Sequence, residues 1–175
     1  SLPDDPDIPL DFPRPMTHSL AGAKHRFSAG RDLTDRLISL ARSHESTLFS
    51  VLTAGYAMLL SKYSSQEELI IGTPVAGRTR NELNGTIGMF VNMLPLRVKA
   101  TPKNPISSLI RQVHDTSLDA FSHQNCQFNT LVDLAHGGRE SASTPLLKFA
   151  IVMENMDAPG QTFDDHSVRL SDISV

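Results

Sequence analysis

An apolar stretch in the first half of the chain requires a core to form around it. Thr47 can accept a hydrogen bond from the first turn of a helix, which then extends to about Lys62. Large apolar side chains lie on almost every side of that helix: Leu48, Phe49, Val51, Leu52, Tyr56, Met58, Leu59 and Leu60. A helix that is apolar on all sides is stable in water only when it is covered, so we predict burial on several sides.

The remaining hydrophobic patterns predict an alternation of helices and strands. Helices are expected at residues 32–43 and at 128–135 before Gly137-Gly138, and a third has Asn104 as its cap and Pro105 as its first residue. Apolar runs predict strands at residues 69–72 and 146–153, and alternation predicts one at 90–99. Residues 24–28 are expected to form a short edge strand and residues 168–173 a final strand. Pro95 indicates an edge, a bulge or a strand end, and residues 77–88 form a polar loop. This order predicts an α/β fold.

The composition is that of one globular domain. The chain has 175 residues, of which 39% are hydrophobic and 20% charged. The net charge of −3 excludes a broadly basic nucleic-acid surface, and no apolar run is long enough to span a membrane. The single cysteine, Cys126, cannot form an internal disulfide, which favours a reducing, cytoplasmic location.

Five prolines between Pro3 and Pro15 predict an extended linker over residues 1–23. The absence of an initiator methionine suggests a piece of a larger protein.

Motifs for common chemistries are incomplete in this sequence. Residues 72–79 approach a phosphate-binding loop, but Arg78 replaces the lysine and Pro74 lacks a backbone donor. We therefore expect a turn in which Arg78 pairs with a carboxylate or with carbonyls. The seven histidines include no helical i, i+4 pair, so no zinc site is predicted. His123 and Cys126 lack an orienting third group, which favours a free thiol over a nucleophile.

Asn92 is a polar residue on an apolar strand face, which it shares with Phe90, Leu94, Leu96 and Val98. A buried amide without partners is costly, so its side chain must be satisfied. Two interpretations stay open. Asn92 either bonds to nearby backbone or lines a channel or cleft.

Four segments, in this order, resemble condensation domains of nonribosomal peptide synthetases. They are Gly-Thr-Pro-Val-Ala-Gly-Arg at 72–78, Ile-Gly-Met-Phe-Val-Asn-Met-Leu-Pro-Leu-Arg at 87–97, His-Gln-Asn-Cys-Gln-Phe-Asn at 123–129 and Arg-Glu-Ser-Ala-Ser-Thr-Pro-Leu at 139–146. The third is similar to the family's His-Gln-Asp-x-Pro-Phe-Glu and the fourth to its Arg-Asp-x-Ser-x-x-Pro-Leu. Residues 10–15 resemble the link into the domain's second lobe. The chain departs from these patterns at Asn125, Gln127, Asn129 and Glu140.

The resemblance implies a chloramphenicol-acetyltransferase-like fold, in which two lobes form a V around a reaction tunnel. Two carrier proteins present thioester-bound substrates on phosphopantetheine arms, and the donor acyl group passes to the acceptor amine to form an amide. The family's His-His-x-x-x-Asp-Gly motif lies in the N-terminal lobe, and this sequence has no His-His pair. The chain therefore resembles the C-terminal lobe over residues 24–175, truncated at its C-terminus, with an inter-lobe linker over residues 1–23.

The resemblance also implies roles for individual residues. No residue of this chain is expected to be catalytic or to bind a metal or a cofactor directly. Asn92 is expected to line the active-site region, and the loop at residues 77–88 to form its floor. Arg78 and Arg139 are expected to brace the structure. Motif positions without an assigned role are His123, Gln124, Phe128 and Pro145.

Expected partners are the N-terminal lobe of the same domain and the donor and acceptor carrier proteins, with no nucleic acid and no membrane. The isolated chain is expected to be inactive, and its exposed inter-lobe surface favours self-association. Two other functions fit the same fold: a carrier-protein-binding lobe without chemistry, and a lobe of an epimerisation domain. A free-standing coenzyme A acyltransferase would need its own catalytic histidine motif, which the sequence lacks.

Overall fold

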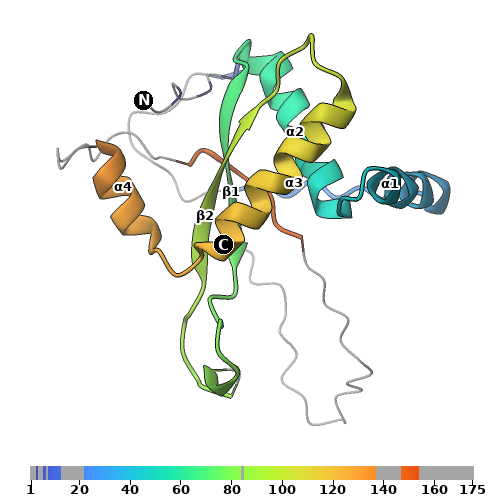
Figure 1. Ribbon diagram of the computed structural model, residues 1–175. Helices are drawn as coiled ribbons and strands as arrows, with labels where there is room; N and C mark the ends of the chain where they lie inside the picture. Colours follow the sequence, from blue (N-terminus) through green and yellow to red (C-terminus); the bar gives the residue numbers. More distant parts are fainter. Residues whose placement is uncertain are drawn as a thin grey trace.

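The computed structural model describes residues 3, 6, 8–12, 22–83, 85–136 and 147–153. Along this part of the chain lie four α-helices, a short 3-10 helix and three strands (Figure 1). In chain order they are α1 (Arg31–Ser43), α2 (Leu48–Ser64), β1 (Glu68–Val75), η1 (Asn81–Leu83), β2 (Asn92–Lys99), α3 (Ile106–Ser122), α4 (Phe128–His136) and β3 (Phe149–Ala150).

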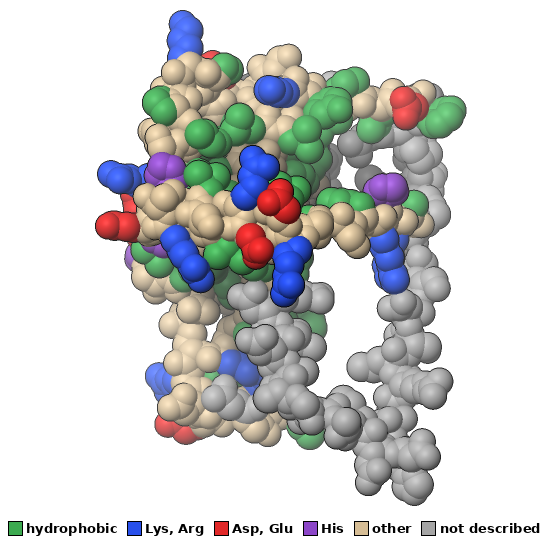
Figure 2. Space-filling model, turned by 90° about the vertical axis from the view of Figure 1, so that its right-hand side faces the viewer, with side chains coloured by type: hydrophobic (Ala, Val, Ile, Leu, Met, Phe, Trp, Pro, Cys, Tyr) green, Lys and Arg blue, Asp and Glu red, His purple; other side chains and the backbone are tan. Residues whose placement is uncertain are grey.

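The three strands form a mixed sheet in the order β2-β1-β3. β1 and β2 are antiparallel, with Ile71 opposite Leu96, and β3 runs parallel to β1. Helices α2 and α3 pack against one another and against the sheet, whereas α1 extends to one side and contacts α2 (Figure 1). On the side of the molecule that Figure 2 shows, apolar side chains lie among charged side chains of both signs.

The core lies where α2 and α3 cover β1 and β2. Alternation along the strands places Leu69, Ile71, Leu96 and Val98 in it, all with fully buried side chains. From α3, Ile110 and Val113 and, from α2, Ala54 and Ala57 complete the layer. Each large apolar side chain buried in this way contributes about 1.5–3 kcal/mol to stability.

Pro95 occupies the free edge of the described sheet. The carbonyl of Gly72, which stands opposite Pro95, accepts a hydrogen bond from Ile151 N at 2.9 Å on the β3 side. The Gly72–Pro95 pair therefore exchanges no ladder hydrogen bonds, and the proline faces outward, where its missing N–H is not needed. Of the edge, bulge and strand end that the sequence left open, the structure shows the edge.

Helix α2 begins as predicted but is covered less than predicted. Thr47 is its N-cap, and its hydroxyl accepts a hydrogen bond from Ser50 N at 3.1 Å. Small side chains make up most of the buried face, which lets α2 approach α3 closely: Ser50, Thr53, Ala54, Ala57 and Ser61. Several large apolar side chains face outward instead, namely Leu52, Met58, Leu59 and Tyr63. The prediction of burial on several sides is confirmed where α1, α3 and β1 contact α2. It was wrong for the face that carries these four exposed side chains, which no described element covers.

Three other predictions of local structure need correction. Helix α3 begins at Ile106, with Pro105 as its N-cap rather than its first residue, because Pro105 has an extended ψ of 144°. Its carbonyl accepts hydrogen bonds from Ser108 N and Leu109 N. Residues 24–28 are exposed and form no strand, since no described strand lies beside them. The strand expected at 146–153 is reduced to β3, because only this part pairs with β1.

Some sequence predictions lie outside the described residues. They are the strand at residues 168–173, the glycine pair at 137–138, and the motif positions Arg139 and Pro145. Of the expected linker, Pro6 is buried and Ile8 packs against the core, whereas Leu10 and Phe12 are exposed.

Candidate site at the root of the hairpin

A cavity of about 520 Å³ lies where the β1–β2 hairpin meets the turn that joins α3 to α4. Five amide side chains line it, together with apolar residues of the segment 89–93: Asn92, Gln124, Asn125, Gln127 and Asn129. None of the described residues that line the cavity has an ionisable side chain. The cavity is therefore polar but uncharged. Two of the segments singled out in the sequence, at 87–97 and 123–129, meet here.

Asn92 connects the first residue of β2 to the α3–α4 turn. Its Nδ2 donates hydrogen bonds to the carbonyl oxygens of Gln124, at 2.9 Å, and Cys126, at 2.7 Å. Its Oδ1 accepts a hydrogen bond from the backbone N–H of Phe128 at 3.1 Å. The half-buried amide is thus bonded to backbone and also lines the cavity. The two interpretations that the sequence left open are therefore compatible.

Arg78 crosses the loop between the two strands. Its guanidinium donates to the carbonyls of Leu83, Thr86 (3.0 Å) and Gly88 (3.4 Å). The same group lies over the ring of Phe90, 4.5 Å from its centroid. Arg78 thus contacts carbonyls, one of the two kinds of partner expected from the sequence.

Gly77 allows the two ends of this loop to approach each other. It has a positive φ of 65°, and a Cβ there would lie 1.8 Å from the carbonyl oxygen of Phe90. Only glycine fits such an approach without movement of the backbone. Gly77 and Arg78 therefore hold together the two ends of the loop that joins β1 to β2, which we call the root of the hairpin.

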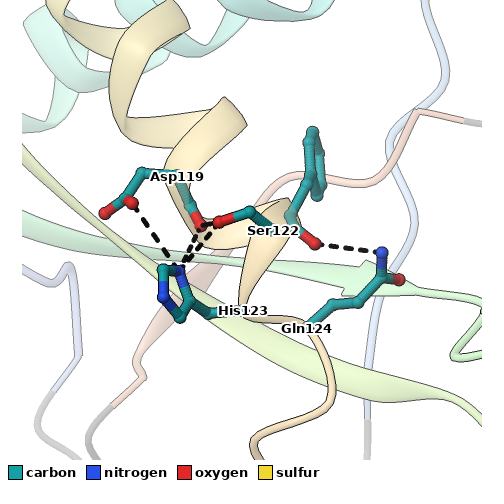
Figure 3. Close-up of polar contacts among 5 residues, drawn as sticks. Asp119, Ser122, His123 and Gln124 are labelled. Atoms are coloured by element: carbon teal, nitrogen blue, oxygen red, sulfur yellow. Dashed lines mark hydrogen bonds and ion pairs between the residues drawn. The ribbon is translucent and has the colours of Figure 1, made fainter.

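His123 is the C-cap of helix α3 and is not among the residues that line the cavity. Its Nδ1 lies 2.9 Å from both the Asp119 carbonyl oxygen and Ser122 Oγ (Figure 3). The Asp119 carboxylate is 3.6 Å away, and the histidine side chain is 75% exposed. Beside it, Gln124 Nε2 donates to the carbonyl of Phe121 at 3.0 Å (Figure 3). These contacts fix the last turn of α3 and bring no base into the cavity.

Among the described residues, the site offers amide and backbone groups for hydrogen bonding and no ionisable lining side chain. Cys126 is half-buried and contributes its carbonyl, not its thiol, to the contacts described above. Among the residues the structure describes, no cluster of three or more His, Cys, Asp or Glu side chains could hold a metal ion. In the same part of the chain, no helix is long and apolar enough to cross a membrane.

Sequence reasoning missed two features of this site. Thr79 Oγ1 donates to Asn125 Oδ1 at 3.3 Å, which ties the loop to the α3–α4 turn. The loop also carries three exposed apolar side chains, Ile87, Met89 and Val91, which are 100%, 92% and 62% exposed, and the last two also line the open cavity. Their alternation was a signal in the sequence, but it indicates a strand as readily as an exposed face.

Comparisons with known proteins decide the family. The condensation-domain family model matches residues 2–175. The chain belongs to this family. Tyrocidine synthase 2 of Brevibacillus parabrevis is 38% identical over 158 residues, or 90% of this chain and 4% of that protein. Gramicidin S synthase 2 of Brevibacillus brevis is 37% identical over 150 residues, or 86% of this chain and 3% of that protein. The chain thus spans a small part of these synthases.

Solved structures agree with the fold. A crystal structure of a holo four-domain nonribosomal peptide synthetase bound to AMP and glycine has a TM-score of 0.80 and 29% identity, over 86% of this chain and 12% of that one. The first condensation domain of the calcium-dependent antibiotic synthetase, in complex with substrate analogue 3a, has a TM-score of 0.56 and 21% identity. The matched region covers 68% of this chain and 25% of that condensation-domain chain, and the match bears on the fold alone. The chloramphenicol-acetyltransferase-like α/β fold, with helices packed on a mixed sheet, is confirmed.

Proposed function

We propose that this chain is the C-terminal lobe of a nonribosomal peptide synthetase condensation domain and forms one wall of the site where an amide bond is made. The observation that carries the proposal is the family match over residues 2–175. The cavity supports it, because residues of the second and third resembling segments line the same space. Gly77, the last residue but one of the first segment, also lines it.

The reaction joins two substrates that carrier proteins deliver on phosphopantetheine arms. The amine nitrogen of the acceptor attacks the thioester carbonyl carbon of the donor, a C–N bond forms and the C–S bond breaks. The amine proton leaves, and the released thiolate of the donor arm takes up a proton. The uncharged cavity wall of this chain would position substrates and exclude water. The proton-handling histidine would come from the His-His-x-x-x-Asp-Gly motif of the N-terminal lobe.

The N-terminal lobe is the first partner of this proposal. The exposed apolar side chains of the loop, Ile87, Met89 and Val91, are the kind of surface that another protein surface covers. In the isolated chain they remain in water, which favours self-association. Sedimentation of the isolated chain over a concentration series should show dimers or larger species. A single monomeric species at all concentrations would contradict this part of the proposal.

A chimera tests the proposed function. In tyrocidine synthase 2, the segment that this chain matches is replaced by the chain, and amide formation between carrier-bound substrates is followed by mass spectrometry. Product is expected from the chimera and not from the isolated chain. The matched control changes the His-His pair of the host's N-terminal lobe to alanine, which should abolish product.

Each of the other outcomes of this experiment contradicts a specific part of the proposal. A folded chimera that binds carrier proteins without forming product would favour a non-catalytic carrier-binding lobe. Inversion of a carrier-bound residue without amide formation would favour an epimerisation domain. Product from the isolated chain would refute the requirement for a second lobe.

A further inference from the structure

Asn92 has no free donor with which to bind a substrate. Both hydrogens of its Nδ2 are used by the carbonyls of Gln124 and Cys126, at 2.9 and 2.7 Å. Its Oδ1 already accepts from Phe128 N. We propose that Asn92 is a positioning residue that holds the α3–α4 turn as one wall of the cavity. Its relevance to amide formation rests on the proposed function, whereas its effect on the turn does not.

Helix α4 begins without a good capping side chain of its own. The first intrahelical hydrogen bond, from Leu131 N, ends on the carbonyl of Gln127, so Gln127 stands at the N-cap position. Glutamine is not among the side chains that cap helices well. Asn92 instead supplies the acceptor for Phe128 N, from 36 residues earlier in the sequence. Helix α4 is therefore capped by a residue of strand β2.

The turn between α3 and α4 also depends on this amide. Residues 123–125 form a turn, and the backbone hydrogen bond that closes it runs from Cys126 N to the His123 carbonyl. Other backbone hydrogen bonds join residues 123 and 124 to α3 and Gln127 to α4. The Asn92 amide adds two donors to carbonyls of this stretch. Gln124 carries one of those carbonyls and Gln127 follows the other, and both residues line the cavity. Asn92 is thus the side chain that fixes this wall relative to β2.

Substitution by aspartate separates the two roles of the amide. Aspartate has the shape of asparagine but would present an oxygen to two carbonyl oxygens where Nδ2 donates now. It would keep the acceptor for Phe128 N. Asn92→Asp should therefore release the turn while the start of α4 stays capped, whereas Asn92→Ala should release both. A residue that served only to contact substrate would give neither pattern.

Amide hydrogen exchange, resolved by residue with NMR on the 175-residue chain, tests this assignment. In Asn92→Ala, exchange of the Phe128 and Cys126 amides should be at least about tenfold faster than in the wild type, with the amides of β1 unchanged. In Asn92→Asp, Cys126 should be affected and Phe128 protected. Asn125→Asp, the same chemical change at an exposed position of the cavity, is the matched control and should leave both amides protected. Unchanged exchange at residues 124–131 in Asn92→Ala would overturn the proposal.

A rescue variant separates positioning from substrate contact. Gln127→Ser places a good capping side chain at the start of α4, so in the Asn92→Ala background it should restore protection in the first turn of that helix. In the chimera, Asn92→Ala should lower the rate at saturating substrate about tenfold or more, and Gln127→Ser should restore part of it. No restoration of rate with restored protection would indicate direct substrate contact and overturn the positioning role. If Asn92→Ala does not fold, Asn92→Asp and the rescue variant carry the same test.

Hydrogen exchange tests the positioning role of Asn92, and the chimera tests the proposed function, so each claim can be refuted without the other. Loss of protection in the isolated chain together with an inactive wild-type chimera would refute the proposed function and leave the positioning role. An active chimera with unchanged exchange in Asn92→Ala would refute the positioning role and leave the proposed function.

Discussion

One substitution, glycine to alanine, should have opposite effects at two positions of this chain. At Gly77 the backbone has a φ of 65°, and an added Cβ would lie 1.8 Å from the Phe90 carbonyl oxygen and 2.8 Å from its carbon. At Gly55, in helix α2, an added Cβ meets nothing within 4 Å and the glycine is exposed. The chemical change is identical, so the difference isolates the geometry of the hairpin root.

The magnitudes follow from the two environments. A left-handed conformation costs alanine about 1–2 kcal/mol, and moving the loop by about 1 Å to relieve the overlap brings the expected loss for Gly77→Ala to about 3 kcal/mol. For a chain of this length, that corresponds to a fall in Tm of about 6–12 °C. Gly55→Ala should raise the free energy of unfolding by about 0.5–1 kcal/mol, because alanine has less conformational freedom to lose in a helix.

Urea unfolding followed by circular dichroism measures both variants against the wild type. Equal m-values would show that the same surface is exposed on unfolding and that the free energies can be compared. The reasoning is refuted if Gly77→Ala is within about 0.5 kcal/mol of the wild type. It is also refuted if both variants change stability with the same sign.

Three further predictions use the same assay. Thr47→Ala should lower the free energy of unfolding by about 1 kcal/mol by removing the acceptor for Ser50 N, and Thr47→Ser should be close to neutral. Ile71→Ala should lower it by about 2–5 kcal/mol, because that side chain is fully buried in the central strand, and a loss below about 1 kcal/mol would contradict the assigned core. The hydrogen bond from Arg97 holds the pKa of Glu68 below its ordinary value of 4.5. The pair should therefore stabilise the fold above that pH and lose its effect as the pH falls through the lowered pKa, and Glu68→Gln should remove this small contribution to the acid slope.

Local signals in the sequence were sufficient to predict most of the helices. Thr47 followed by an apolar segment identified the start of α2, because a cap depends on the few residues beside it. The boundary of α3 differed by one residue, since proline is accepted both at the cap and in the first turn. The strand at residues 90–99 was recognised from its alternation, and the structure begins it at Asn92.

Features that depend on distant parts of the chain could not be predicted. Leu52 and Leu59 look like core residues in the sequence, but exposure depends on which elements reach that side of α2. Asn92 could be recognised as a polar residue on an apolar face, yet its partners lie 32 to 36 residues away. Only the folded chain brings β2 beside the α3–α4 turn that accepts these hydrogen bonds. The family resemblance pointed to both segments without indicating that they touch.

The role of this chain as one of two lobes is tested most directly by measuring amide formation for the isolated chain and the tyrocidine synthase 2 chimera in one assay, with the same carrier-bound substrates. We expect product from the chimera and none above background from the isolated chain. A folded chimera without product, or an isolated chain that forms product, would contradict the claim that this chain is one wall of a two-lobed condensation site.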